Sequence, residues 1–396
     1  MSKSTAQLIQ HFRQQFLQSR GVRSNMPGCS STLTHFNNAG QSPLCRPSSE
    51  VLDLWNMRLA EEGAHGYPDF DQAANLARTH IARFMGCSVS EIAFFQGTAA
   101  SISQIAFGVE LHPGDEILIW DQEYPSNFYP WMIAARRSGA RLVVLKSDPD
   151  LSTPISTIER AITDKTKVIA SSWVQFKSGA MCDLKTLSAL ARSKNIFTAI
   201  DVIQGAGCLP FNFTELGLDA VSGGSHKWFA AGHGAGFLCL REEHLERIFP
   251  IMVGAGTFGG SERPVDLDAK PRSGAARYEP GGKAISQIIS LGAAADLFTQ
   301  TGIENIAQEI ETSSLALGQS LEERGYQVNW PQGNYRRGSI VNFSPRPSSR
   351  FKTLTEIGEA LKFAGISFAT REPGIRLSPH AFNTKEDIES VLVALS

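Results

Sequence analysis

The middle of the chain alternates short apolar runs with amphipathic stretches, and this alternation limits the possible folds more than any other feature. The stretches 158–164 and 184–195 carry apolar side chains at helical spacing. The apolar runs, each typical of a buried strand, are 115–121, 140–146, 167–174, 197–203 and 236–242. Strands that alternate with helices predict an α/β fold, with a mostly parallel sheet covered on both faces and right-handed crossovers.

The length of 396 residues exceeds that of an average domain, so we expect two lobes. We predict a large domain at 36–290 and a smaller domain built from residues 1–35 and 291–396. The segment 259–282 is rich in Gly, Pro, Arg and Asp, and it is predicted to be a long loop. Loops of this length inside compact domains are often functional. A helix is expected to follow, from about Ala284 to Phe298.

Charge and composition exclude several classes of protein. The chain has 37 Lys and Arg against 39 Asp and Glu, so we expect no nucleic-acid partner. No stretch approaches the roughly 18 uninterrupted apolar residues that span a bilayer, so we expect no membrane partner. The start does not read as a secretory signal, and the six cysteines are scattered. Neither the cysteines nor the nine histidines show ligand spacing, so we expect a cytoplasmic protein with free thiols and no metal.

The glycine-rich segment 218–237, LDAVSGGSHKWFAAGHGAGF, sets Lys227 between small residues and an aromatic pair. Glycines let a ligand approach the backbone closely. In a half-buried setting the charged ammonium is disfavoured, and a neutral amine is the nucleophile that Schiff-base chemistry requires. For this segment alone, a solvated surface lysine in a glycine-rich loop is the alternative.

Two further segments carry polar residues where an apolar strand ends. In FTAIDVIQGAG, Asp201 ends the strand and Gln204 follows three residues later. A carboxylate there can pair with a pyridinium nitrogen and keep that ring a good electron sink, although an Asp that caps the next helix is an alternative. In FFQGTAASISQIAFG (94–108), Gly-Thr begins a helix whose free N–H groups suit an anion. This segment has neither the Walker nor the dinucleotide pattern, which disfavours nucleotide binding.

In this order, the features resemble the class V aminotransferase superfamily of fold-type I pyridoxal phosphate (PLP) enzymes, in its cysteine desulfurase-like and C–S lyase-like branch. The tripeptide 225–227 matches the family's S-H-K, residues 201–204 its D-x-x-Q, and residues 97–98 its G-T turn. The resemblance runs from 36–40 to 374–384. It implies a large domain with a mostly parallel seven-stranded sheet, a smaller α/β domain, bound PLP, and a homodimer with shared active sites.

The resemblance also implies a role for each matching residue. Lys227 forms the internal aldimine and moves the proton at the substrate α carbon, and Thr257 reaches the phosphate of a neighbouring subunit. Arg277 lies in a matching segment, where its role is either functional or purely structural. The implied cofactor-binding residues are Gly97, Thr98, Ala99, Tyr124, Asp201, Gln204, Ser225, His226, Lys227 and Thr257. The implied substrate-binding residues are Asn38, Ala39, Gly40 and Arg376, whose planar guanidinium suits a carboxylate.

Three departures separate this chain from the cysteine desulfurases it resembles. The segment 350–370 contains no cysteine to accept sulfur as a persulfide, so we expect no sulfur-acceptor protein. Tyr124 stands where the family has a histidine over the cofactor ring, and a phenol is a poorer proton shuttle near neutrality. Phe176 replaces an asparagine near the ring, which makes the pocket more apolar.

Several reactions fit these residues. Our first hypothesis is a C–S lyase that acts through an external aldimine and α-carbanion, by β-elimination on cysteine, cystine or a cysteine conjugate. The alternatives are amino-group transfer to a 2-oxo acid, and epimerisation, for which Tyr124 is the one candidate for a second acid/base. A catalytically inactive scaffold is disfavoured because Lys227 and Asp201 are both present.

Overall fold

The computed structural model describes residues 4–16, 33–259, 267–331 and 338–396, and its centre is a seven-stranded sheet. The spatial order of the strands is β2-β8-β7-β6-β5-β3-β4. Strand β8 is antiparallel to both neighbours, and the other pairs are parallel. The strands are β2 (Ile92–Phe95), β3 (Glu116–Trp120), β4 (Arg141–Leu145), β5 (Thr166–Ser172), β6 (Phe197–Asp201), β7 (Ala220–Gly224) and β8 (Gly236–Leu240). The predicted α/β fold with a mostly parallel seven-stranded sheet is confirmed.

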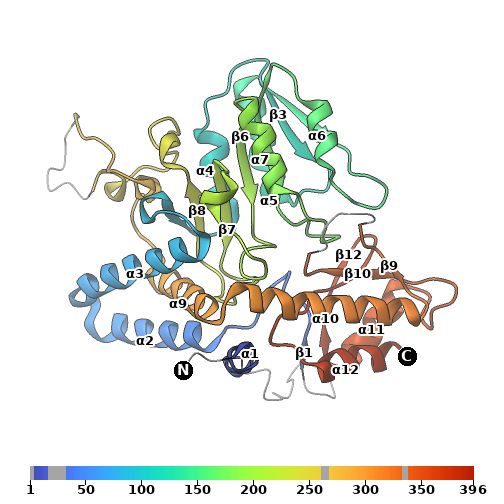
Figure 1. Cartoon of the computed structure of the whole chain (residues 1–396). Helices are drawn as coiled ribbons and strands as arrows, with labels where there is room; N and C mark the ends of the chain where they lie inside the picture. The colour runs from blue at the N-terminus through green and yellow to red at the C-terminus, as the bar shows by residue number, and fades with distance from the viewer. Residues whose placement is uncertain (1–3, 17–32, 260–266, 332–337) are drawn as a thin grey trace.

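Helices cover both faces of this sheet (Figure 1). Strand β3 shows why: Ile117 and Ile119 point to a core shared with α4 and α5, while Leu118 and Trp120 point to the opposite core with α3, α7 and α9. This alternation follows from the two-residue period of a strand. The helices of this part are α1 (Thr5–Gln14), α2 (Arg46–Glu62), α3 (Tyr67–Met85), α4 (Thr98–Gly108), α5 (Pro125–Ser138), α6 (Ile155–Ala161), α7 (Leu184–Ser193), α8 (Phe213–Leu216) and α9 (Ile285–Thr301).

A second, four-stranded antiparallel sheet forms the other lobe, in the order β12-β13-β10-β9. It shares a separate hydrophobic core with the C-terminal helices, and α10 continues from α9 toward it (Figure 1). A short parallel pair, β1 with β11, joins the N-terminal segment to this lobe. The elements are β1 (Thr34–His35), β9 (Gln327–Val328), β10 (Val341–Ser344), β11 (Ile366–Ser367), β12 (Ala369–Arg371), β13 (Gly374–Leu377), α10 (Ile303–Glu323), α11 (Leu354–Phe363) and α12 (Lys385–Leu395).

The domain limits 36–290 remain a prediction, because the packing joins segments across them. In α1, Phe12 lies edge-to-face against Phe298 of α9, with ring centres 5.1 Å apart. The hydrophobic core of the second lobe is formed by residues from Leu317 onward and by Phe36. Helices α11 and α12 begin with side-chain caps from Thr353 and Thr384, which satisfy backbone N–H groups of the first turn.

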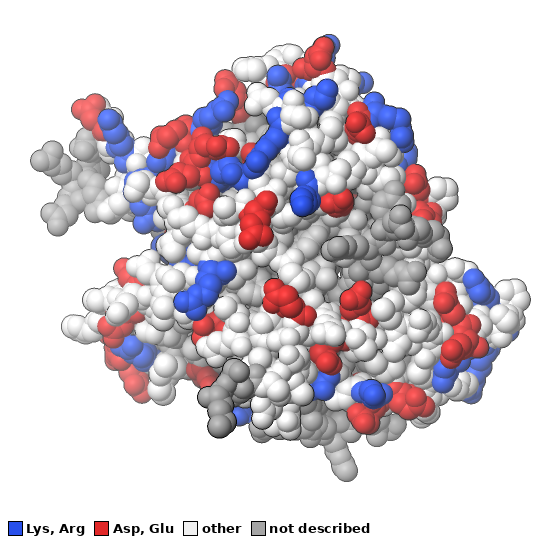
Figure 2. Space-filling model, in the orientation of Figure 1, with Lys and Arg blue, Asp and Glu red and all other residues white. Residues whose placement is uncertain are grey.

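The surface agrees with the balanced composition. On the face in Figure 2, basic and acidic side chains are interspersed. Across the described ranges, we find no helix that is both long and apolar enough to cross a membrane.

Candidate active site

The candidate residues meet at one edge of the large sheet. Strands β2 and β7 are both antiparallel to β8, so their carboxyl ends lie at the same edge as those of β3, β5 and β6. Asp201 is the last residue of β6, and Lys227 follows β7 by three residues. In open α/β sheets, ligands bind outside the carboxyl ends of the strands.

Lys227 is buried, with 8% of its surface exposed, so it is not the solvated surface lysine of the alternative interpretation. Its Nζ lies 5.4 Å from the centre of the Tyr124 ring. Burial lowers the pKa of Lys227, the charge of Asp201 opposes this, and Arg376 and Arg371 lower the pKa further. A neutral amine is therefore accessible near neutral pH, as a nucleophile requires.

Asp201 does not cap a helix. Its Oδ1 accepts a bond of 2.9 Å from the backbone N–H of Ile203. The next helix, α8, begins only at Phe213 and is capped by Asn212. Burial raises the pKa of Asp201, while the positive charge of Lys227 lowers it. A buried carboxylate with one modest hydrogen bond favours a cationic partner.

The amide of Gln204 links two parts of the site. Its Nε2 donates to the carbonyl of Ala39 at 3.0 Å, and its Oε1 accepts from the indole Nε1 of Trp228 at 3.0 Å. The segment around Ala39 is thereby held beside the chain that carries Lys227.

The start of α4 forms a cradle suited to an anion. Thr98 is the first residue of α4, and its buried Oγ1 has no hydrogen-bond partner among the described residues. A Cβ added at Gly224 would lie 2.7 Å from that oxygen and 3.7 Å from Nδ1 of His226, so only glycine admits this approach. The first N–H groups of a helix have no intrahelical acceptor, and Thr98 and Ala99 supply two of them. The unpartnered hydroxyl and these N–H groups fit a phosphate.

Ser225 and His226 lie beside this cradle. The Ser225 Oγ is 2.5 Å from the carbonyl oxygen of Gly232 and 2.7 Å from that of Ala235, and its single proton can serve only one of them. The His226 ring stacks on His233, with centres 4.3 Å apart. Burial, with smaller effects from Lys227 and His233, lowers the pKa of His226 to about 4. His226 is therefore a neutral imidazole when no anion is bound.

Tyr124 and Phe176 form an aromatic wall of the site. Their rings meet edge-to-face, with centres 5.0 Å apart. Tyr124 precedes the first residue of α5 and is 40% exposed, so part of its ring is open to a ligand.

Arg376 is 1% exposed and lies in β13. Its Nη1 donates to the carbonyl of Phe176 at 2.8 Å, and its Nη2 donates to Oδ1 of Asn37 at 3.3 Å. Its Nε has no partner among the described residues. A buried guanidinium with an unused donor and, among the residues that the structure describes, no acidic partner suits a carboxylate ligand.

The N-terminal segment approaches Arg376 through a residue that sequence reasoning missed. The neighbour of Arg376 is Asn37, whereas the amide of Asn38 is held by Ser378 and Ser42. Gly40 packs closely against Asn37, where an added Cβ would lie 2.7 Å from Oδ1. The motif FNNAG offered two adjacent asparagines, and the sequence carried no signal to choose between them.

Thr257 and Arg277 are both buried and hydrogen-bonded within the chain. The Oγ1 of Thr257 accepts a bond of 3.2 Å from the N–H of Gly254. The guanidinium of Arg277 pairs with Glu246 at 2.6 Å and donates to the carbonyl of Leu245. These bonds give Arg277 a structural role in the segment 245–279.

Glu123 is a further member of the site that the sequence did not indicate. It is buried directly before Tyr124, and its carboxylate accepts hydrogen bonds from the backbone and side chain of Ser172, from Asn127 and from Gln175. Burial raises its pKa, and these four donors act in the opposite direction. Glu123 thus joins the end of β5 to the start of α5.

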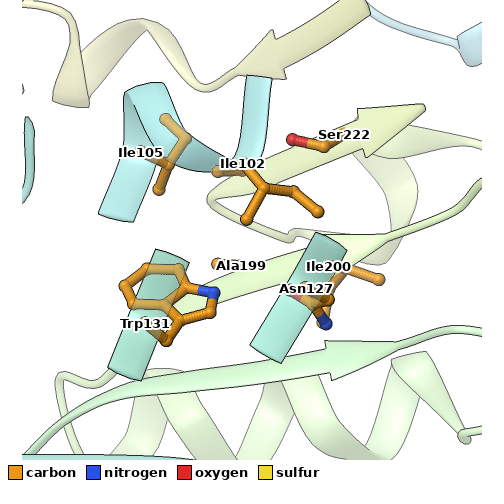
Figure 3. Close-up of a pocket in the computed structure, with 8 residues that line it drawn as sticks. Ile102, Ile105, Asn127, Trp131, Ala199, Ile200 and Ser222 are labelled. Carbon is orange, nitrogen blue, oxygen red and sulfur yellow. The ribbon is translucent and has the colours of Figure 1, made fainter. Parts of the chain in front are cut away.

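Two other features lie apart from this site. A cavity of about 10 Å³, room for about one water molecule, lies between α4, α5 and strands β6 and β7 (Figure 3). It is too small for a substrate. The side chains of Asp219, Glu243 and His244 bring potential metal-ligand atoms together, which spacing did not predict. The 2.8 Å bond between Asp219 and His244 already accounts for this contact.

Comparison with known proteins gives consistent results. A family model described as aminotransferase class-V matches residues 49–391. A protein named probable cysteine desulfurase, from Halalkalibacterium halodurans, is 30% identical over 338 residues, covering 81% of this chain and 80% of that protein. The solved cysteine desulfurase of Thermococcus onnurineus has a TM-score of 0.83 at 22% identity and covers 91% of this chain and 93% of its own. The cystine C–S lyase C-DES, solved with its product cysteine persulfide, has a TM-score of 0.82 at 24% identity, with coverages of 92% and 97%.

Proposed function

The chain belongs to the aminotransferase class-V family, and on that premise we propose that this pyridoxal-phosphate-dependent enzyme cleaves the carbon–sulfur bond of L-cysteine, L-cystine or a cysteine conjugate. The single observation that carries the choice of reaction is the lack of any cysteine in 350–370. A desulfurase needs an accessible thiolate there. The described cysteines elsewhere are unpaired, and burial raises the pKa of Cys182 to about 12. An elimination needs no such thiol.

The residues of the site fit the cofactor. Thr98, Ala99 and His226 would hold the phosphate, as the unpartnered Thr98 hydroxyl supports. Asp201 would pair with the pyridine nitrogen, Gln204 would lie near the ring hydroxyl, and Tyr124 would stack on the ring. When bound, PLP withdraws electrons from the α carbon of an amino acid. The further proposed contacts with the cofactor are those of Gly97, Ser225 and Thr257.

The reaction then depends on the protein's own groups. Arg376 binds the substrate carboxylate through its buried guanidinium and so sets which face of the α carbon meets Lys227. Lys227, kept close to neutral by burial, takes the proton from the α carbon. Asn38, Ala39 and Gly40 close the substrate side of the pocket. The aromatic wall of Tyr124 and Phe176 lines the site beside Lys227.

Amino-group transfer is the second candidate, because the matching family model is named for that reaction. In that reaction Lys227 would deliver the proton to the cofactor carbon, and the substrate would keep its sulfur. Epimerisation requires a second acid/base opposite Lys227, and Tyr124 is the candidate for that position.

We also propose that the enzyme is a cytoplasmic homodimer with shared active sites. The segment before Thr257 exposes apolar side chains, with Phe249 71% and Val253 53% exposed, which supports a subunit contact there. The free cysteines in the described ranges support a reducing compartment.

The test is product analysis with L-cysteine and with L-cystine. The proposal predicts pyruvate and ammonia, together with sulfide from L-cysteine or cysteine persulfide from L-cystine, formed by the wild-type protein and lost in Lys227→Ala. L-Alanine with a 2-oxo acid serves as the opposing assay. If the amino group of L-alanine is transferred and no pyruvate arises from the sulfur amino acids, the enzyme is an aminotransferase and the lyase proposal is wrong.

A further inference from the structure

His380 is a fully buried histidine that has no part in the reaction described above. It lies three residues beyond the end of β13, and none of its surface is exposed. Its ring is nearly parallel to the rings of Phe12 and Phe382, with centres 5.7 and 5.1 Å away. Packing alone does not require a polar ring here, so the role of His380 depends on the hydrogen bonds of its two ring nitrogens.

These hydrogen bonds fix which ring nitrogen carries the proton. Burial lowers the pKa of His380 to about 4, so the imidazole is neutral near pH 7, with one donor and one acceptor nitrogen. The backbone N–H of Ala381 donates to Nδ1 at 2.8 Å, which makes Nδ1 the acceptor. The proton is therefore on Nε2, which lies 3.1 Å from the carbonyl oxygen of Trp228. His380 thus donates to the residue that follows Lys227.

The carbonyl of Trp228 depends on this donor. Trp228 is fully buried, and among the residues that the structure describes no backbone N–H donates to its carbonyl. Gly207 packs against the same carbonyl with a φ of +100°, and an added Cβ there would lie 2.9 Å from the oxygen. The surroundings are therefore too close for another group to take the place of the imidazole. A buried carbonyl without a donor is unfavourable.

The bond from His380 completes a set of contacts that hold the backbone beside Lys227. The carbonyl of Lys227 accepts from the N–H of Ala230 at 2.9 Å, and the indole of Trp228 donates to Gln204. Since a lysine side chain is a flexible four-carbon stem, the position of Nζ depends on how firmly its backbone is held. The segment that carries His380 also carries Arg376, four residues earlier. One segment therefore places both the arginine of the site and the peptide beside its lysine.

We propose that His380 is a positioning residue, whose Nε2–H holds the carbonyl of Trp228 and thereby keeps the amine of Lys227 in place for its bond with the cofactor. This inference rests on the proposed function, in which Lys227 binds PLP covalently. The imidazole acts through Trp228, and the cluster around Phe12 and Phe382 keeps its ring in the required orientation.

The test is a double-mutant cycle on PLP binding, measured by fluorescence titration of the cofactor-free proteins. His380→Phe keeps an aromatic ring and loses the Nε2–H. We expect it to raise the dissociation constant for PLP by roughly three- to tenfold, the net size of one hydrogen bond. In Lys227→Ala there is no amine to place, so the further change His380→Phe should leave the dissociation constant of that variant unchanged.

His380→Gln and His380→Asn are the matched controls. Both lose the ring, but only the longer amide of Gln reaches the position of Nε2, so His380→Gln should bind PLP more tightly than His380→Asn. This pair also decides the question if thermal melts show that His380→Phe does not fold.

A rise of the same size with and without Lys227, no rise in His380→Phe, or equal constants for the Gln and Asn variants would overturn the inference. A wild type that does not bind PLP would instead contradict the proposed function.

Discussion

Tyr124 lies against Lys227, with the ring centre 5.4 Å from Nζ, and the two residues come from different strand ends of the same sheet. Phe176 packs edge-to-face against the ring, and the backbone N–H of Ser172 donates to the side chain of Glu123, the residue before Tyr124. This arrangement leaves a flat aromatic surface next to the buried amine of Lys227.

Removing the Tyr124 ring should weaken cofactor binding. Tyr124→Ala is expected to raise the dissociation constant for PLP by up to roughly tenfold, because an aromatic stacking contact contributes about 0.5–1.5 kcal/mol. Tyr124→Phe keeps the ring and should bind PLP like the wild type. Fluorescence titration of the apoenzyme with PLP measures both constants. Equal losses in the two variants would show that the hydroxyl, and not the ring, makes the contact.

The cofactor-free protein should become more stable as the pH rises above about 8. Burial lowers the pKa of Lys227 from its ordinary 10.5 to about 8. Between these values the unfolded chain binds more protons than the native protein, so the free energy of unfolding increases with pH. Below about pH 8 the native state carries the full cost of a buried charge.

Lys227→Met removes this cost, and it also removes the positive charge that lowers the pKa of Asp201 and so offsets part of the gain. We expect the variant to exceed the wild type by on the order of 1 kcal/mol at pH 7, with the difference shrinking toward pH 10.5. Urea denaturation of both cofactor-free proteins at several pH values measures it. A difference that is independent of pH would contradict the assigned pKa shift.

Glu123 should matter for both stability and the cofactor's environment. Glu123→Gln places an amide N–H₂ where an acceptor is needed, leaving donors of Ser172 or Asn127 unsatisfied, at a cost of roughly 1–3 kcal/mol. Because Tyr124 follows directly, we also expect a shifted absorption band of bound PLP. Glu116→Gln is the control: Glu116 is equally buried, at the start of β3, and bonded to Arg141 and Thr163.

The control should lose stability but keep the spectrum of the wild type. If both variants, or neither, shift the absorption band, then Glu123 has no specific effect on the position of the Tyr124 ring.

Patterns in short stretches of sequence predicted the strands, whose formation depends mainly on residues close together in the chain. The apolar runs became β3 to β6 and β8 within a few residues, and the motif order placed Lys227, Asp201 and Thr98 at one edge of the sheet. Residues whose role depends on distant partners were missed. Glu123 acquires its role only when Ser172 and Gln175, about fifty positions later, are brought beside it.

The same reason explains Asn37. Its side chain contacts Arg376 across 339 positions. This relationship leaves no periodic or spaced pattern in the chain, because tertiary packing alone creates it.

The absorption spectrum of the purified protein, compared with that of Lys227→Ala, tests whether Lys227 holds the cofactor. We expect PLP added to the wild type to give the visible band of lysine-bound cofactor and sodium borohydride to fix the cofactor covalently at Lys227, and we expect the variant to show neither. A visible band and covalent labelling that persist in Lys227→Ala, or a wild type that never shows them with added PLP, would contradict this role of Lys227.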